Sequence, residues 1–291
     1  MPNWTAFSGL TGVVLVLLLS LARLSQGQDM SERPNESTPQ SNSNHETEAF
    51  TTKDSDQQNE AEISTNTTEN TNSNSNSNRQ LSSPSDEAPT QPQFSAGMLL
   101  ANVALSQGLF GFILVAGAWY TAIPPAALGL DVRDPLSVGL LAVGVGVVTG
   151  LGLYAANAVG AASATALGYE YEEQLRDLLT PETPAGWVLL LCGVLPIIAG
   201  FEELLFRGVL IGVLSSGFAI SPWFLAGGSS VAFAVGHGAQ GRLGILVTGI
   251  LGFALAVVFI YTNSLLAVVV AHYLVNALEF IIGGAMGIEW G

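Results

Sequence analysis

Apolar runs about as long as a membrane is thick recur from residue 94 onward, and short stretches of Gly, Pro and Asp separate them. A helix that spans a bilayer needs roughly 20 consecutive apolar residues. The pattern therefore predicts an all-α fold, a polytopic bundle of about seven transmembrane helices when the apolar run near the N-terminus is included. The expected spans are residues 7–22, 98–123, 138–161, 185–214, 222–236, 243–261 and 265–284.

The first apolar run, residues 7–22, has two interpretations. Ser20-Leu21-Ala22 resembles the small-x-small cleavage site of a signal peptide. Residues 1–10, however, lack the Lys or Arg of a signal peptide, and Arg23 follows the run, which is typical of a retained helix whose C-terminal end faces the cytoplasm. We expect a retained transmembrane helix within residues 1–26, and a signal peptide is the alternative.

Residues 27–93 are rich in Ser, Asn and Thr and poor in aliphatic residues. Such a segment buries too little apolar surface to fold, so we expect a disordered acidic linker between the first helix and the membrane domain, residues 94–291. The linker carries most of the formal net charge of −15, which argues against a nucleic-acid partner. The acidic excess and a single lysine, Lys53, indicate a halophile host, although an acidic linker alone would give the same bias.

Two parts of the membrane domain differ from a plain span. Residues 165–179 place apolar side chains at helical spacing among acidic ones, which predicts an amphipathic surface helix beside the membrane. The run that starts at residue 185 is long for one bilayer crossing. We therefore expect it to kink at Pro196 or to continue as a helix beyond the bilayer.

Charged residues interrupt this long run. Glu202 and Glu203 are adjacent, and Arg207 follows four residues after Glu203. A charged side chain at membrane depth costs at least about 2.5 kcal/mol, so such residues usually face a protein interior and mark a functional site. Three polar residues that could serve as partners lie in later apolar runs: His237, His272 and Asn276.

Helical geometry suggests a division of tasks between the two glutamates. Positions four apart share a helix face, so we expect Glu203 and Arg207 to form a structural ion pair. Glu202 points about 100° away and is available to a partner on another helix, as a general base or acid. A carboxylate, two imidazoles and an amide could then share one polar cavity with donors for an oxyanion, although each polar residue alone is more often a packing element.

Three motifs carry a family resemblance. Glu202 to Arg207 fits EExxxR, Phe233 to His237 fits FxxxH, and His272 to Asn276 fits HxxxN. In this order, each on its own span, they resemble the CPBP family of intramembrane proteases, which includes the type-II CAAX prenyl endopeptidases and bacteriocin-processing or bacteriocin-immunity proteins. The resemblance covers about residues 185–284. It implies an all-helical domain that hydrolyses peptide bonds in a polar cavity open to one leaflet.

The resemblance also implies residue roles. The implied catalytic residues are Glu202, His237, His272 and Asn276, and the site-shaping residues are Glu203, Arg207 and Phe233. By position, Glu202 would activate a water molecule with help from His237, whereas His272 and Asn276 would stabilise the oxyanion.

Family members have been described both as glutamate-type proteases and as metalloproteases. Glu202, His237 and His272 could supply the three protein ligands of a zinc site. The HExxH pattern of zincins is absent, however, so we favour a glutamate mechanism that requires no cofactor.

We therefore expect a CAAX prenyl protease 2-like intramembrane endopeptidase, multi-pass in the cell membrane. Its partners would be the lipid bilayer and a membrane-associated peptide or protein, with or without an attached lipid. Two other functions use buried polar residues. One is a proton-coupled transporter, although the sequence has no convincing internal repeat. The other is a binding or bacteriocin-immunity protein that does not hydrolyse peptides.

Overall fold

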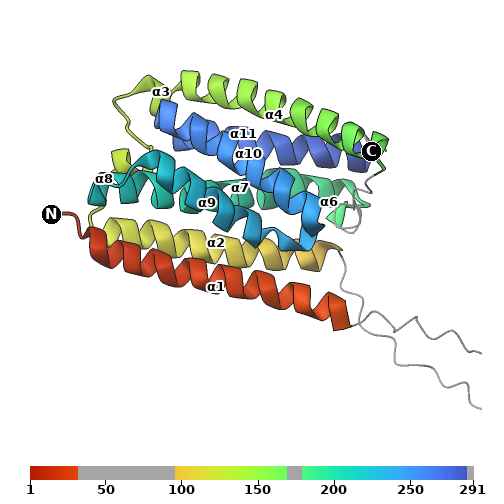
Figure 1. Ribbon diagram of the computed structural model, residues 1–291, viewed down its shortest axis with the longest axis horizontal. Helices are drawn as coiled ribbons and strands as arrows, with labels where there is room; N and C mark the ends of the chain where they lie inside the picture. Colours follow the sequence, from red (N-terminus) through yellow and green to blue (C-terminus); the bar gives the residue numbers. More distant parts are fainter. Residues whose placement is uncertain (32–95, 169–178, 287–291) are drawn as a thin grey trace, which may run out of the picture. The chain divides into compact units, whose positions relative to one another are not determined.

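The computed structural model describes residues 1–31, 96–168 and 179–286, and its regular elements within these ranges are all helices (Figure 1). This confirms the predicted all-α fold. Most of the predicted acidic linker and of the predicted amphipathic helix lies outside the described residues. At the start of the linker, helix α1 (Trp4–Ser31) continues past the predicted boundary at residue 26.

Six helical segments in the described ranges are long and apolar enough to cross a membrane. They lie within α1, α2 (Ala96–Tyr120), α4 (Leu140–Ala166), the continuous segment Pro184–Phe218, α10 (Gly241–Thr262), and α11 (Leu265–Leu278) with η5 (Glu279–Ala285). The remaining predicted span is helix α9 (Pro222–Gly236), and its 15 residues are fewer than the roughly 20 that a crossing needs. Shorter turns connect the long helices: η1 (Pro125–Leu128), α3 (Pro135–Val138) and η4 (Gly238–Gln240).

The segment Pro184–Phe218 changes its helical type along its length. It is α-helical in α6 (Pro184–Leu189), α7 (Leu195–Glu203) and α8 (Leu214–Phe218), and π-helical in η2 (Leu190–Val194) and η3 (Leu204–Val213). Pro196 has no N–H to donate to the preceding turn, which accounts for the irregular turn η2 directly before it. Because π-helical turns occur often at functional sites, it matters that η2 and η3 flank the helix that carries both glutamates.

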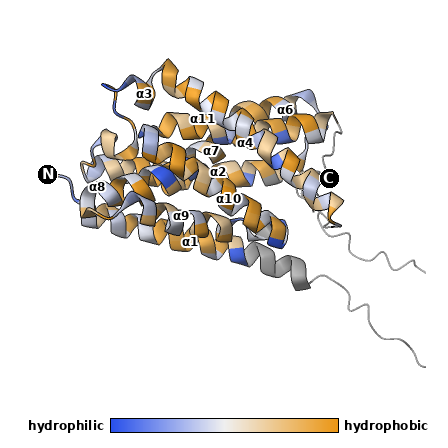
Figure 2. Ribbon diagram, turned by 45° about the horizontal axis from the view of Figure 1, so that its top comes forward, coloured by the Kyte–Doolittle hydropathy of each residue, from blue (hydrophilic) through white to orange (hydrophobic). Residues whose placement is uncertain are grey.

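The long helices run roughly side by side, with α1 and α2 along one edge of the bundle and α4 and α11 along the other (Figure 1). The segment of α7 and η3 lies between them, and its side chains from Leu204 to Val209 are buried. Apolar residues occur along every long helix (Figure 2). Large apolar side chains also remain exposed on the outside, such as Phe112, Leu140 and Val148, as expected for a surface that faces lipid.

Helix α1 packs into the same core as the rest of the bundle. Phe7 is fully buried, and Thr11 and Val14 are almost so. Gly117 of α2 allows this close approach, because a Cβ atom there would collide with Leu10 of α1. A bundle without α1 would therefore expose an apolar face that the present fold buries.

Helices α4 and α11 approach each other through glycines. A Cβ atom on Gly146 would lie 2.6 Å from the Ala267 carbonyl oxygen, and one on Gly150 would lie 2.9 Å from the Ala271 carbonyl oxygen. Both distances are shorter than real Cβ contacts, so the two backbones touch only because these positions lack side chains. This contact fixes helix α11, the helix of His272.

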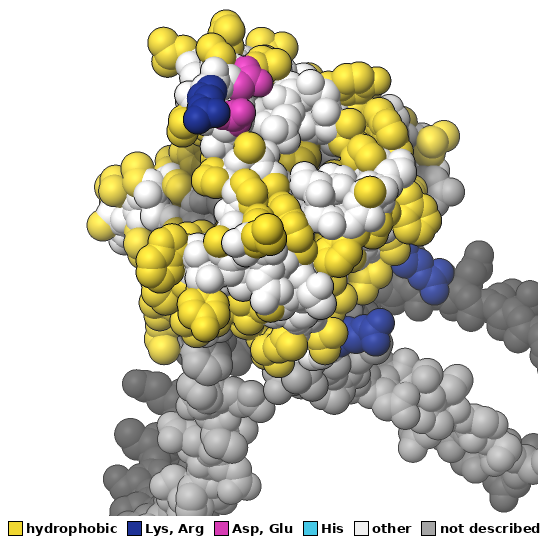
Figure 3. Space-filling model, turned by 90° about the vertical axis from the view of Figure 1, so that its left-hand side faces the viewer, with side chains coloured by type: hydrophobic (Ala, Val, Ile, Leu, Met, Phe, Trp, Pro, Cys, Tyr) yellow, Lys and Arg dark blue, Asp and Glu magenta, His cyan; other side chains and the backbone are white. Residues whose placement is uncertain are grey.

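Charged side chains are sparse on the outside of the bundle. Figure 3 shows an end face that is mostly apolar, with acidic and basic side chains together at its top and further basic side chains at its lower right edge. The connection between η1 and α3 contains three charged residues: Asp131, Arg133 and Asp134. This distribution fits a body immersed in a bilayer with its charges at the water-facing ends.

Candidate active site

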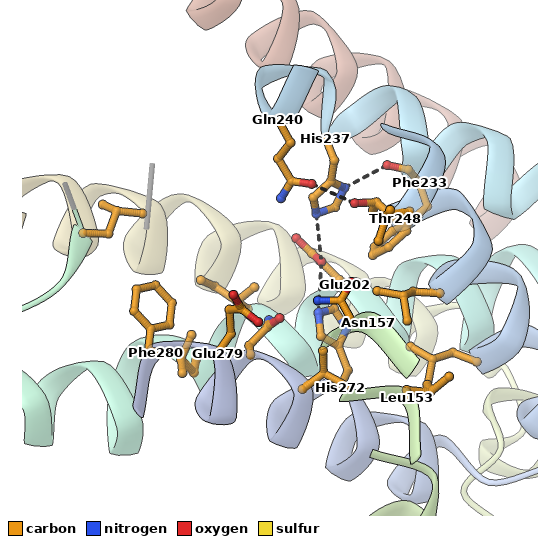
Figure 4. Close-up of a pocket in the computed structure, with 18 of the residues that line it drawn as sticks. Leu153, Asn157, Glu202, Phe233, His237, Gln240, Thr248, His272, Glu279 and Phe280 are labelled. Carbon is orange, nitrogen blue, oxygen red and sulfur yellow. Dashed lines mark hydrogen bonds and ion pairs between the residues drawn. The ribbon is translucent and has the colours of Figure 1, made fainter. Parts of the chain in front are cut away.

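A cavity of about 290 Å³ lies among α2, α4, α7, α9, α10 and α11 (Figure 4). The four residues predicted as catalytic all line this cavity, together with Phe233. They come from three elements: Glu202 from α7, His237 from the C-terminal end of α9, and His272 with Asn276 from α11. The other two predicted site-shaping residues, Glu203 and Arg207, are fully buried.

The two oxygens of Glu202 have different surroundings. Its Oε2 lies 3.8 Å from His237 Nε2 and 3.7 Å from His272 Nε2, and within the described ranges it makes no hydrogen bond. Its Oε1 accepts a hydrogen bond of 3.4 Å from Nε2 of Gln107 in α2. The side chain is almost buried, with 7% of the residue exposed, so the bare Oε2 is directed into the polar part of the cavity.

The partners of the two histidines determine which ring nitrogens face Glu202. His237 Nδ1 lies 2.8 Å from the Phe233 carbonyl oxygen, and His272 Nδ1 lies 2.7 Å from Glu203 Oε1. Both oxygens can only accept from an N–H, so each Nδ1 carries the proton. A neutral imidazole then presents the Nε2 lone pair, and three acceptors converge: two Nε2 atoms and Glu202 Oε2. Three acceptors this close together require a hydrogen-bond donor between them. A water molecule can donate its two O–H groups to two of the three atoms.

Glu203 is the buried anchor beneath this group. Its Oε1 accepts from Arg207 Nη1 at 2.7 Å, which is the ion pair that the i,i+4 spacing predicted. The same oxygen accepts from His272 Nδ1 at 2.7 Å. Arg207 also donates through Nη2 to the Gly252 carbonyl oxygen at 2.8 Å. The chain Arg207–Glu203–His272 therefore fixes the orientation of the His272 imidazole from the protein interior.

Phe233 packs between the charged and the imidazole groups. Its ring centroid lies 4.4 Å from that of His237 and 6.0 Å from that of His272. The Arg207 guanidinium carbon lies 4.8 Å from the same centroid, within the range of a cation–π contact. Gly252 leaves room for this ring, because a Cβ atom there would lie 2.9 Å from Phe233 Cδ1.

The comparison with protein families agrees with this geometry. Residues 183–278 match the family model described as "Type II CAAX prenyl endopeptidase Rce1-like". This segment forms a Rce1-like domain. For this segment the match confirms the family that the three motifs indicated. The long apolar helices support a multi-pass membrane protein around it. Neither the curated proteins nor the solved structures that were compared contain a match to the chain.

The cavity also uses helices outside the Rce1-like domain. Asn157 of α4 lines the cavity, and Gln107 of α2 contacts Glu202. Both residues precede the matched segment. The cavity wall is therefore completed by two helices that the family comparison does not cover.

Sequence reasoning missed several polar residues at the site. Gln107, Asn157, Gln240, Thr248 and Glu279 all contact Glu202 or line the cavity. Thr248 Oγ1 donates to Gln240 Oε1 at 2.7 Å, which fixes the Gln240 amide at the cavity wall. The only feature of the sequence that could have revealed them is a polar residue within or beside an apolar run. Glu279 shows this feature as clearly as Glu202 does. The sequence did not reveal which of these residues share one cavity.

The zinc alternative was tested against the positions of the donor atoms. Glu202, His237 and His272 have the donor types that zinc takes. Within the described ranges, however, no three His, Cys, Asp or Glu residues have the arrangement of a metal site. Glu202 Oε2 nevertheless lies only 3.8 Å from His237 Nε2 and 3.7 Å from His272 Nε2. The glutamate mechanism without a metal ion therefore stays a prediction, and no step of the mechanism below is assigned to a metal.

Proposed function

We propose that this protein is an intramembrane endopeptidase in which Glu202 activates a water molecule. It would hydrolyse peptide bonds of membrane-associated peptides or proteins, with or without an attached lipid, in the cell membrane. One observation carries the proposal: the unpaired Glu202 Oε2 lies within 4 Å of both histidine Nε2 atoms in the cavity of a Rce1-like domain.

The first step is the attack of water on the peptide carbonyl carbon. A water molecule between the three acceptors donates one hydrogen to Glu202 Oε2 and the other to His237 Nε2. Glu202 takes its proton as the new C–O bond forms. His237 keeps the second hydrogen bond, which orients the water's lone pair toward the carbonyl carbon.

The second step stabilises the oxyanion and releases the amine. In the form of the protein in which solvent has protonated His272 Nε2 before the attack, the water is held by Glu202 and His237 alone, and the His272 Nε2–H donates to the oxyanion. The Glu203 carboxylate at Nδ1 supports this imidazolium. Asn276, one helical turn further along α11, adds an amide N–H. Glu202 then returns its proton to the leaving nitrogen as the C–N bond breaks, and the water oxygen remains in the new carboxyl group.

The cavity lining supports the choice of a membrane-associated substrate. Apart from its polar end, the cavity is walled by apolar side chains such as Leu100, Leu190 and Ile198. A water-soluble, strongly charged peptide would lose its hydration there without gaining polar partners. An apolar or lipid-bearing chain would not pay this cost.

The test uses purified protein in proteoliposomes with a library of membrane-anchored peptides, read by mass spectrometry. Glu202→Gln should lower kcat by about 10²–10⁴-fold, the usual effect of losing a general base. Glu182→Gln is the matched control, because Glu182 is exposed just before α6 and is not among the described residues that line the cavity. A Glu202→Gln variant that cleaves at the wild-type rate would remove the mechanism.

The same samples separate the glutamate mechanism from a metal mechanism. We expect activity to survive a chelator and the active protein to contain no stoichiometric zinc. If the chelator abolishes activity and added zinc restores it, a metal ion takes part in activating the water, and Glu202 does not do so alone.

A further inference from the structure

We propose that Gln107 is a positioning residue that holds the catalytic carboxylate of Glu202 in its working orientation. This inference rests on the proposed function and deepens it. Gln107 lies on α2, outside the segment that matches the family model. Among the described residues, its Nε2 is the only group found to donate a hydrogen bond to the Glu202 side chain, at 3.4 Å from Oε1.

A donor on one oxygen makes the two carboxylate oxygens of Glu202 unequal. Oε1 accepts from Gln107, whereas Oε2, as far as the described residues go, has no hydrogen bond beside the two Nε2 atoms. Rotation of the carboxylate about its last bond would have to break the contact with Gln107. The contact therefore favours the orientation in which one lone-pair-bearing oxygen faces the water position between the histidines.

The amide of Gln107 suits both protonation states of a general base. Its own Oε1 is buried and has no hydrogen-bond partner in the part of the chain that the structure describes. When Glu202 is ionised, the Gln107 N–H group donates to it. When Glu202 has taken a proton from water, a half-turn of the amide presents Oε1 as an acceptor for that proton. An ammonium or guanidinium group at this position would favour the ionised form alone.

Gln107 is not required to hold α2 against α7. Phe110 of α2 stacks on Phe201 of α7, with ring centroids 6.2 Å apart. This apolar contact already joins the two helices. A purely structural role would therefore predict little effect of an apolar side chain of the same length at position 107.

The kinetic test compares Gln107→Met, which keeps length and volume, with Ser106→Ala. Ser106 is the matched control, because its hydroxyl donates to the Val103 carbonyl oxygen of its own helix. We expect Gln107→Met to lower kcat about tenfold with KM within about twofold, as for an interaction that acts on the chemical step. Ser106→Ala should behave as the wild type. An unchanged kcat in Gln107→Met would overturn the proposal.

A spectroscopic readout keeps the test independent of cleavage and of one variant's folding. Infrared difference spectra of the wild type and the Gln107→Met and Gln107→Leu variants are recorded, with Glu202→Gln backgrounds to assign the Glu202 carboxylate band. We expect this band to shift in both position-107 variants and not in Ser106→Ala. No shift would overturn the proposal even in an active enzyme. A different outcome is a band shift in the position-107 variants together with a wild-type protein that cleaves no peptide. That outcome would refute the proposed function and the role of Gln107 in catalysis, but it would confirm the hydrogen bond between Gln107 and Glu202.

Discussion

At the scale of residues, the two adjacent glutamates show how neighbours in sequence acquire different tasks. Glu203 binds Arg207 and His272 through one oxygen and is fully buried, whereas Glu202 leaves one oxygen bare in the cavity. The helical spacing predicted the ion pair and the availability of Glu202. It could not predict the Glu203–His272 contact, because 69 residues separate the two and only the packing of α11 against α7 brings them together.

The buried pair leads to a prediction on stability. Arg207→Met should destabilise the protein by about 3–5 kcal/mol, because it leaves the Glu203 carboxylate buried without its cation. The double variant Glu203→Gln with Arg207→Met should be more stable than Arg207→Met alone, since it also removes the stranded charge. Unfolding in mixed detergent micelles measures all three proteins.

Arg242→Met is the matched control for this series, because Arg242 is exposed at the start of α10. It should unfold as the wild type does. If the double variant is no more stable than Arg207→Met, the loss of stability does not come from leaving the Glu203 carboxylate without its cation.

At the scale of elements, the apolar pattern predicted where most helices lie. The expected run 222–236 coincides with α9, and the expected run 243–261 lies within Gly241–Thr262. The pattern did not predict the π-helical turns around the glutamates, because these arise from backbone hydrogen bonds that shift along the helix. Nor did it predict which glycines contact a neighbouring helix, since that depends on the partner's position.

The glycine contact between α4 and α11 gives a prediction on activity. A side chain at Gly150 would meet the Ala271 carbonyl oxygen and Leu274 Cβ, each at 2.9 Å, directly beside His272. Gly150→Leu should therefore displace α11 and lower both kcat and the thermal unfolding temperature. Enzyme kinetics and thermal unfolding in detergent measure the two effects.

Gly152 provides the control on the same helix, because a Cβ atom at that position would have no described atom of another element within 4 Å. Gly152→Leu should retain the wild-type rate and stability. Equal losses in the two variants would mean that the effect comes from helix α4 itself and not from its contact with α11.

At the scale of the whole molecule, the site depends on more of the chain than the matched family segment. Residues 183–278 supply both glutamates and both histidines. Helices α2 and α4, which come earlier in the chain, add Gln107 and Asn157. The three motifs predicted the family and the residues that meet, because each motif occupies its own helix. The motifs did not predict Gln107 and Asn157, because a single Gln or Asn in an apolar run has no motif around it.

The most direct measurement of the central claim is a comparison of protein termini in membranes from cells that carry the wild type, Glu202→Gln or Glu182→Gln. If Glu202 activates the water that cleaves membrane-associated substrates, a set of new C-termini and N-termini will be present with the wild type and with Glu182→Gln. The same set will be absent with Glu202→Gln. Identical termini in all three membranes, with the variants present at equal levels, would contradict the account.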